Sequence, residues 1–189
     1  ASPAILCESA VLIDGGTGTI LAQKNADKKM YPASLTKIMT AILAIEMGEL
    51  SDVITVDEDT PYEIEGSHIA LEPGEILTLK DLLYALMLPS ANDAASVIAK
   101  HYGGSLENFV KLMNAKAREL GALNTNFANP HGLHDENHYT TAADLALITK
   151  YAMENDTFRK IVSTTKYEIQ TTNKKDEPRY FTSLNKLIY

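Results

Sequence analysis

A serine lies three residues before a lysine at three places in the chain, and this spacing can pair a nucleophile with its own base. On a helix, residues three apart are neighbours at about 5–6 Å between Cβ atoms, so an uncharged lysine amine can take the proton of the hydroxyl. About one such match is expected by chance in a chain of this length, so the pattern alone has little specificity. The pairs are Ser34 with Lys37, Ser163 with Lys166, and Ser183 with Lys186.

Local context favours the first pair. Lys166 lies in a stretch of alternating polarity, where residues three apart point to opposite faces, so it would not reach Ser163. Ser183 lies near the C-terminal end, where no element is clearly indicated. Ser34 begins a long apolar helix, whose free N–H groups and positive dipole end favour an alkoxide and lower the pKa of Lys37. An ordinary helix-start serine beside a solvated lysine remains an alternative.

A second polar cluster adds weight to the catalytic interpretation. Ser90 and Asn92 follow Pro89 directly and lie between two expected helices, where short polar side chains can project into a cleft. A serine–lysine acyl transferase needs a second hydroxyl to relay a proton to the leaving amine, and an amide to bind the substrate carbonyl. The alternative is that one of these residues merely caps the following helix.

Four short segments carry these residues in a fixed order: Pro32 to Ala41, Leu71 to Glu75, Ser90 to Ala95, and Asn129 to Leu133. Together they closely resemble the D-alanyl-D-alanine carboxypeptidases, the low-molecular-mass penicillin-binding proteins, which are serine–lysine acyl transferases. The resemblance covers roughly residues 8–186, and the ordered set is far more specific than any one segment.

That resemblance implies the chemistry of the site. Ser34 would be the acylated nucleophile, Lys37 its base and Ser90 the proton relay, with Asn92 binding substrate. The enzyme would remove the terminal D-alanine of peptidoglycan stem peptides, would be acylated by β-lactam antibiotics, and would use no cofactor. It would act outside the cytoplasm, secreted or anchored to the outer face of the bacterial cytoplasmic membrane, in cell-wall synthesis and the control of cell shape.

Two other functions stay open on the same fold. A β-lactamase would need a glutamate and an asparagine to activate water, and Glu136 with Asn137 lacks the expected Glu-x-x-x-Asn spacing. A non-catalytic peptidoglycan-binding protein is the second alternative, because the family's third motif, Lys-Thr-Gly or Lys-Ser-Gly, is not found in these 189 residues.

Residues 183–189 resemble the segment that usually precedes this third motif. We therefore expect residues 1–189 to be the N-terminal portion of a single penicillin-binding catalytic domain that stops before the motif. A C-terminal segment or a second chain would then complete both the sheet and the site.

The loop at residues 124–140 contains three histidines, His131, His134 and His138, beside two acidic residues. Their spacing within a loop rich in turn residues is not that of a helical HExxH site, so we predict no metal. The resemblance places this loop beside the cleft, which makes His131 a candidate substrate contact.

The order of elements predicts an α+β fold of the β-lactamase/transpeptidase type. A hairpin is expected at residues 8–25, helices follow over 32–48, 78–88, 94–103, 105–121 and 141–152, a strand covers 166–170, and residues 51–77 are expected to be irregular. Thr78, Ser105 and Thr141 are the predicted capping residues at the starts of three of these helices. We expect the helical cluster to pack on an antiparallel sheet formed by strands from both chain ends, with the later strands missing from this chain.

The charge composition excludes some classes of binding partner. The 189 residues include 17 Lys+Arg against 25 Asp+Glu, a net charge of −8. A nucleic-acid backbone or an anionic membrane needs clustered basic residues, so neither is expected as the main partner. Cys7 is the only cysteine, which excludes an intrachain disulfide and a thiolate zinc site.

Overall fold

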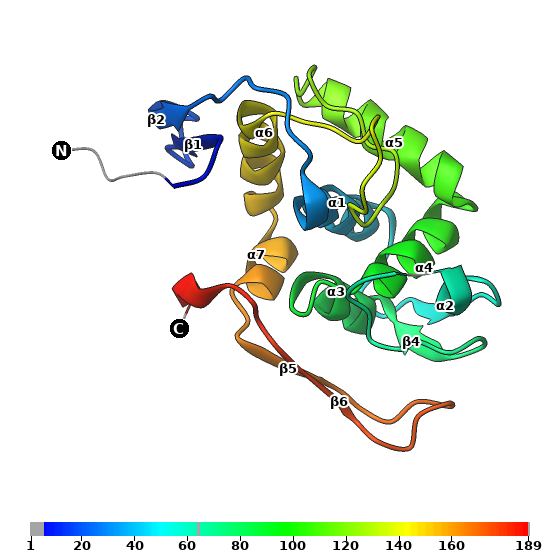
Figure 1. The fold of residues 1–189 in the computed structure, drawn as a ribbon. Coiled ribbons are helices and arrows are strands. Elements are labelled where there is room, and N and C mark those ends of the chain that lie inside the picture. The colour runs from blue at the N-terminus through cyan, green and yellow to red at the C-terminus, as the bar shows by residue number, and fades with distance from the viewer. Residues whose placement is uncertain (1–5, 64, 189) are drawn as a thin grey trace.

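The computed structural model describes residues 6–63 and 65–188 as a cluster of helices flanked by three two-stranded antiparallel sheets (Figure 1). The five predicted helices are all present, together with antiparallel strands, so the α+β class is confirmed. The elements in chain order are β1 (Ala10–Ile13), β2 (Ile20–Lys24), η1 (Ala33–Thr36), α1 (Lys37–Met47), β3 (Val53–Thr55), α2 (Thr60–Glu63), β4 (Ile76–Thr78), α3 (Leu79–Met87), α4 (Asn92–Gly103), α5 (Leu106–Glu119), α6 (Ala142–Met153), α7 (Asp156–Val162), β5 (Lys166–Ile169), β6 (Arg179–Thr182) and η2 (Lys186–Ile188).

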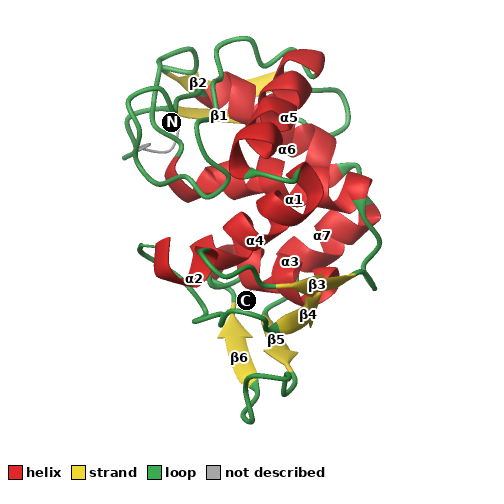
Figure 2. Cartoon of the chain, turned by 90° about the vertical axis from the view of Figure 1, so that its right-hand side faces the viewer, coloured by secondary structure: helices red, strands yellow, loops and turns green. Residues whose placement is uncertain are grey.

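The expectation that strands from both chain ends share one sheet is wrong for the described residues. β1 pairs with β2, β3 with β4, and β5 with β6, each antiparallel. The β5–β6 hairpin projects from the end of the helical body opposite to β1 and β2 (Figure 2). Side chains of the hairpin bind the loop before β4 instead, through Arg179 and Asn173, which explains its position.

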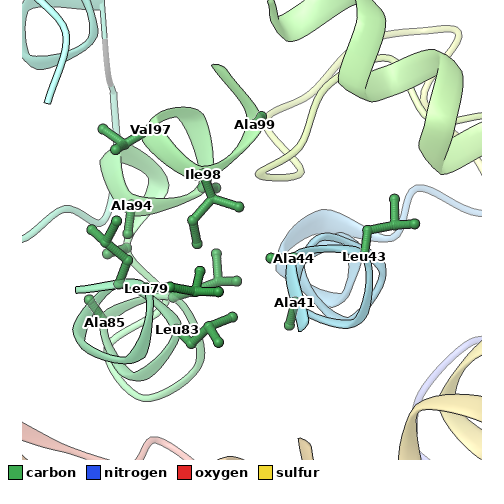
Figure 3. Close-up of a cluster of buried hydrophobic side chains, with 14 of the residues drawn as sticks. Ala41, Leu43, Ala44, Leu79, Leu83, Ala85, Ala94, Val97, Ile98 and Ala99 are labelled. Atoms are coloured by element: carbon green, nitrogen blue, oxygen red, sulfur yellow. The ribbon is translucent and has the colours of Figure 1, made fainter. Parts of the chain in front are cut away.

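α1 runs through the centre of the helical cluster and packs against α3, α4, α5, α6 and α7. Ala41 and Ala44 are fully buried on its surface, and their small side chains let the neighbouring helices approach closely. Leu83 of α3 and Ile98 of α4 point toward α1 (Figure 3). The first residue of this central helix is Lys37, so the core of the molecule fixes the position of the lysine.

Helix starts follow the predicted capping chemistry. Thr78 accepts a hydrogen bond from the Asp81 N–H, and the Asp81 carboxylate bonds back to the Thr78 N–H, a complete capping box. Ser105 and Thr141 cap α5 and α6 through their side-chain oxygens, which accept from the backbone N–H groups of Asn108 and Asp144. The region 51–77, expected to be irregular, contains β3, α2 and β4, and α7 was also missed.

In the part of the chain that the structure describes, no helix is both long enough and apolar enough to cross a membrane.

Candidate active site

The predicted nucleophile lies in a tight turn before the central helix. Ser34 is exposed in the 3₁₀ turn η1, and Lys37, the first residue of α1, is 2% exposed. The Lys37 Nζ lies 3.1 Å from the Ser34 Oγ. Ala33, just before the serine, has a φ of 49°, a strained value for a residue with a side chain. The structure therefore brings the predicted serine and lysine into direct contact.

Lys37 has two further acceptors besides the serine. Its Nζ donates to the Asn92 Oδ1 at 2.7 Å and to the His131 backbone carbonyl at 2.7 Å. Burial lowers the pKa of Lys37 from 10.5 to about 8, because a charged amine loses its hydration in this position. A neutral amine has two N–H bonds and one lone pair. When the N–H groups bind the amide and carbonyl oxygens, the lone pair faces the Ser34 hydroxyl, which is the arrangement of a general base.

The orientation of Asn92 follows from its second hydrogen bond. The Nδ2 group donates to the Glu65 carbonyl at 2.7 Å, so the Oδ1 atom must face Lys37. The Asn92 backbone N–H also donates to the Ser67 carbonyl at 2.7 Å. Asn92 thus positions the lysine, and its predicted contact with substrate stays a prediction. Ala91 occupies the N-cap position of α4, so neither Ser90 nor Asn92 is the cap.

Ser90 has two unusual features. Its backbone φ is 64°, in the left-handed region that residues with a side chain rarely adopt. Its Oγ is buried and has no hydrogen-bond partner within the described residues. A strained backbone and an unpaired hydroxyl are features that collect at functional sites. They fit the predicted proton relay, which stays a prediction.

The loop at 129–133 contributes its backbone to the site. The Pro130 carbonyl accepts from the Thr40 hydroxyl at 2.6 Å, one helical turn beyond Lys37. Gly132 has a φ of 92°, and a Cβ atom there would lie 1.9 Å from the Ala33 carbonyl oxygen and 3.0 Å from the Ser34 nitrogen. Only glycine permits this contact. The sequence shows turn chemistry here and nothing that indicates this close approach, so Gly132 was missed.

The histidines of this loop have separate surroundings. The His131 Nδ1 accepts from the Leu133 N–H at 3.2 Å, and burial, with the Lys37 charge nearby, lowers its pKa to about 4. His131 is therefore neutral near pH 7 and contributes its carbonyl to the lysine; substrate contact by its ring stays a prediction. His134 is exposed against the Tyr31 ring. Among the described residues, no group of three or more His, Cys, Asp or Glu side chains could hold a metal.

The other two serine–lysine pairs have different surroundings. Ser163 ends α7 and donates its hydroxyl to the Lys160 carbonyl at 3.1 Å, whereas Lys166 begins β5. Ser183 follows β6, and its Oγ accepts from the Asn185 N–H at 3.2 Å.

Two buried carboxylates hold the segment that orients Asn92. Asp93, next to Asn92, accepts from the backbone N–H groups of Ile69 and Leu71 at 3.1–3.2 Å. Glu75, fully buried, binds Arg179 of β6 through both oxygens at 2.7 and 3.0 Å. Burial raises the pKa of Glu75, but the hydrogen bonds from Arg179, Thr172 and the Glu72 backbone, with the Arg179 charge, together outweigh this effect and the pKa is lowered. The pattern of residues gave no indication of these pairings.

Comparison with known proteins points to one family. A profile described as D-alanyl-D-alanine carboxypeptidase, Peptidase S11, matches residues 1–189. D-alanyl-D-alanine carboxypeptidase DacF of Bacillus subtilis is 40% identical over 186 residues, which cover 96% of this chain and 47% of that protein. DacC of Escherichia coli is 37% identical over 159 residues, which cover 79% of this chain and 40% of that protein.

Solved structures agree with the sequence comparison. A mutant of the DD-transpeptidase of Streptomyces K15 matches with a TM-score of 0.92 at 32% identity, over 98% of this chain and 77% of that one. A D-alanyl-D-alanine carboxypeptidase from Mycobacterium tuberculosis gives a TM-score of 0.91 at 28% identity, over 98% of this chain and 69% of that one. The chain spans less than half the length of the B. subtilis and E. coli carboxypeptidases. With the serine–lysine pair in contact and the profile matching throughout, the chain belongs to the D-alanyl-D-alanine carboxypeptidase family.

Proposed function

We propose that this chain supplies the nucleophile and the base of a serine-type D-alanyl-D-alanine carboxypeptidase. The observation that carries the proposal is the buried Lys37 amine, which lies 3.1 Å from the exposed Ser34 hydroxyl. The substrate is a peptidoglycan stem peptide that ends in D-Ala-D-Ala, and β-lactams acylate the same serine. Such a substrate lies outside the bacterial cytoplasm, so we also propose an extracytoplasmic location.

The reaction proceeds in two stages. The Lys37 amine takes the Ser34 proton as the Oγ attacks the carbonyl of the penultimate D-alanine. The tetrahedral intermediate collapses, the bond to the terminal D-alanine breaks, and the proton reaches the leaving amine through the Ser90 hydroxyl. Water then attacks the acyl ester and gives its proton to the base, which releases the shortened peptide and restores the Ser34 hydroxyl.

We further propose that a C-terminal segment carrying the third motif completes the site. An apolar groove of about 460 Å³ supports this, because it lies between β1 and α6 and includes Leu35 of the nucleophile turn. Leu12 and Leu35, both in the groove, are 58% and 55% exposed, a costly exposure for two such side chains in one patch. The segment would cover this groove and place a lysine and a hydroxyl opposite Ser34, to bind the substrate carboxylate.

The two alternatives gain less support. Glu136 and Asn137, which a β-lactamase would use to activate water, are both exposed in the loop. Burial of the Lys37 amine beside the Ser34 hydroxyl lowers its pKa and costs stability. A protein that only binds peptidoglycan gains nothing from this arrangement, whereas a catalyst gains a base.

Labelled penicillin tests the proposal. The full-length gene product is incubated with the label, digested and analysed by mass spectrometry. We expect an adduct on Ser34 that the Ser34→Ala variant lacks, slow release of the label, and D-alanine release from a D-Ala-D-Ala peptide. Ser163→Ala is the matched control and should keep the adduct. A folded protein that binds the stem peptide but forms no adduct would refute catalysis, and rapid turnover of penicillin would favour the β-lactamase.

A further inference from the structure

A buried histidine links the nucleophile turn to the loop that holds the lysine. The Nε2 of His138 lies 2.6 Å from the hydroxyl of Thr36, which sits between the nucleophile and the base in η1. Thr36 is fully buried and His138 is 2% exposed, so water does not compete for this bond. The two residues are 102 positions apart in the chain.

The other ring nitrogen of His138 defines its protonation. The backbone N–H of Ala128 donates to the Nδ1 at 2.9 Å, so this nitrogen carries no proton and the Nε2–H donates to the Thr36 oxygen. Burial lowers the pKa of His138 to about 4, against the opposing charge of Asp135, so the neutral form persists well below pH 7. The Phe127 ring packs edge-on at 5.7 Å between centroids.

Ala128 directly precedes the turn whose carbonyls bind α1. The Pro130 carbonyl accepts from Thr40, and the His131 carbonyl accepts from Lys37 at 2.7 Å. His138 therefore joins the start of this turn to η1 at one point, while Thr40 joins it to α1 at another. Two attachment points fix the distance from the carbonyl of His131 to the lysine amine.

We propose that His138 is a positioning residue, which holds the turn that carries the His131 carbonyl against the nucleophile and so keeps the Lys37 amine dry and aimed at Ser34. This inference rests on the proposed acyl transfer at Ser34. When the bond to Thr36 is lost, the loop separates from η1, water reaches the amine, and the pKa of Lys37 rises toward its ordinary value.

Two variants remove the same bond from opposite sides. The His138→Asn variant keeps an oxygen where the Nδ1 stood, so Ala128 retains its acceptor, but the shorter side chain does not reach Thr36. Thr36→Val has nearly the same shape as threonine and removes the acceptor. Thr36→Ser keeps the hydroxyl and is the conservative rescue. His101→Gln, at an exposed histidine of α4, is the matched control.

The readout is the rate of acylation by labelled penicillin as a function of pH, measured on the full-length protein. On the acid side of this pH–rate profile, the rate follows the neutral fraction of Lys37. We expect this part of the profile to shift to higher pH by about one unit in both variants, so that acylation at pH 7 is about tenfold slower. The double variant should move no further than either single one. Thr36→Ser and His101→Gln should match the wild type.

If His138 had only a structural role, its replacement would lower the thermal stability of the protein without shifting the acid side of the pH–rate profile. The proposal is therefore overturned if either folded variant, His138→Asn or Thr36→Val, has the same pH–rate profile as the wild type on the acid side. Absence of acylation in the wild type would instead refute the proposed function. The experiment thus distinguishes a failure of the positioning role of His138 from a failure of the proposed acyl transfer.

Discussion

Replacement of Gly132 by alanine should slow the acylation of Ser34 far more than its effect on the stability of the fold would explain. The added Cβ would lie 1.9 Å from the Ala33 carbonyl oxygen and 2.3 Å from its carbon, whereas real contacts of this kind are not closer than 3.0 Å. The loop or the Ala33–Ser34 peptide must therefore move by about 1 Å, a displacement that can cost about 100-fold in rate at a catalytic group. We expect acylation of Ser34 to slow by about that factor.

Gly121 provides the matched control. Its φ is 84°, close to the 92° of Gly132, but among the described residues no atom beyond its two chain neighbours lies within 4 Å of a Cβ placed there. Both alanine variants should lose about 1–2 kcal/mol of unfolding free energy from the left-handed backbone. Only Gly132→Ala should lose acylation. The assay is stopped-flow acylation with a fluorescent penicillin beside urea unfolding, and a Gly132→Ala protein within about threefold of the wild-type rate would refute the reasoning.

Three further predictions concern charges. Asn92→Asp places a carboxylate 2.7 Å from the Lys37 amine, which favours its charged form, so acylation at pH 7 should fall about tenfold or more and the rate should recover at higher pH. The folded-state pKa of His138, about 4, lies below the unfolded value of 6.5, so the free energy of unfolding should fall by on the order of 3 kcal/mol as the pH drops from 6.5 to 4. Urea unfolding of His138→Gln at several pH values should show a weaker dependence of this free energy on pH than the wild type, and an equal dependence would contradict the prediction. Glu75→Gln leaves the Arg179 charge buried without its partner and should cost roughly 3 kcal/mol in urea unfolding, and no loss would show that the pair does not anchor the β5–β6 hairpin.

The sequence was most informative where the chemistry is local. Ser34 and Lys37 are three residues apart, so helix geometry alone predicts that they meet, and the observed 3.1 Å agrees. Helix starts at Thr78, Ser105 and Thr141 were predicted from caps, because a cap is also a contact over three residues.

Long-range partners were not predictable in the same way. The two other acceptors of the lysine are 55 and 94 residues distant, and the second is a backbone carbonyl, a group that every residue carries. Nothing in the side chain of His131 indicates that its carbonyl has this role. Ser90 and Asn92 were singled out as polar residues between helices, but the orientation of the Asn92 amide depends on the carbonyl of Glu65.

The sheet prediction failed for a related reason. Alternation identified β5, but it does not specify the partner strand. The partner is β6, and the hairpin is held by Arg179 and Glu75, which are 104 residues apart.

The central claim is that Lys37 acts as a base in its neutral form, because burial lowers its pKa enough to leave about a tenth of the amine uncharged at pH 7, and its own titration tests this most directly. The pKa can be measured on the full-length protein by NMR of the lysine side-chain carbons, with Lys37→Met identifying the resonance. The structure predicts a value of about 8, well below the ordinary 10.5. A Lys37 resonance that titrates at about 10.5, in a protein that still acylates Ser34 at pH 7, would contradict the account.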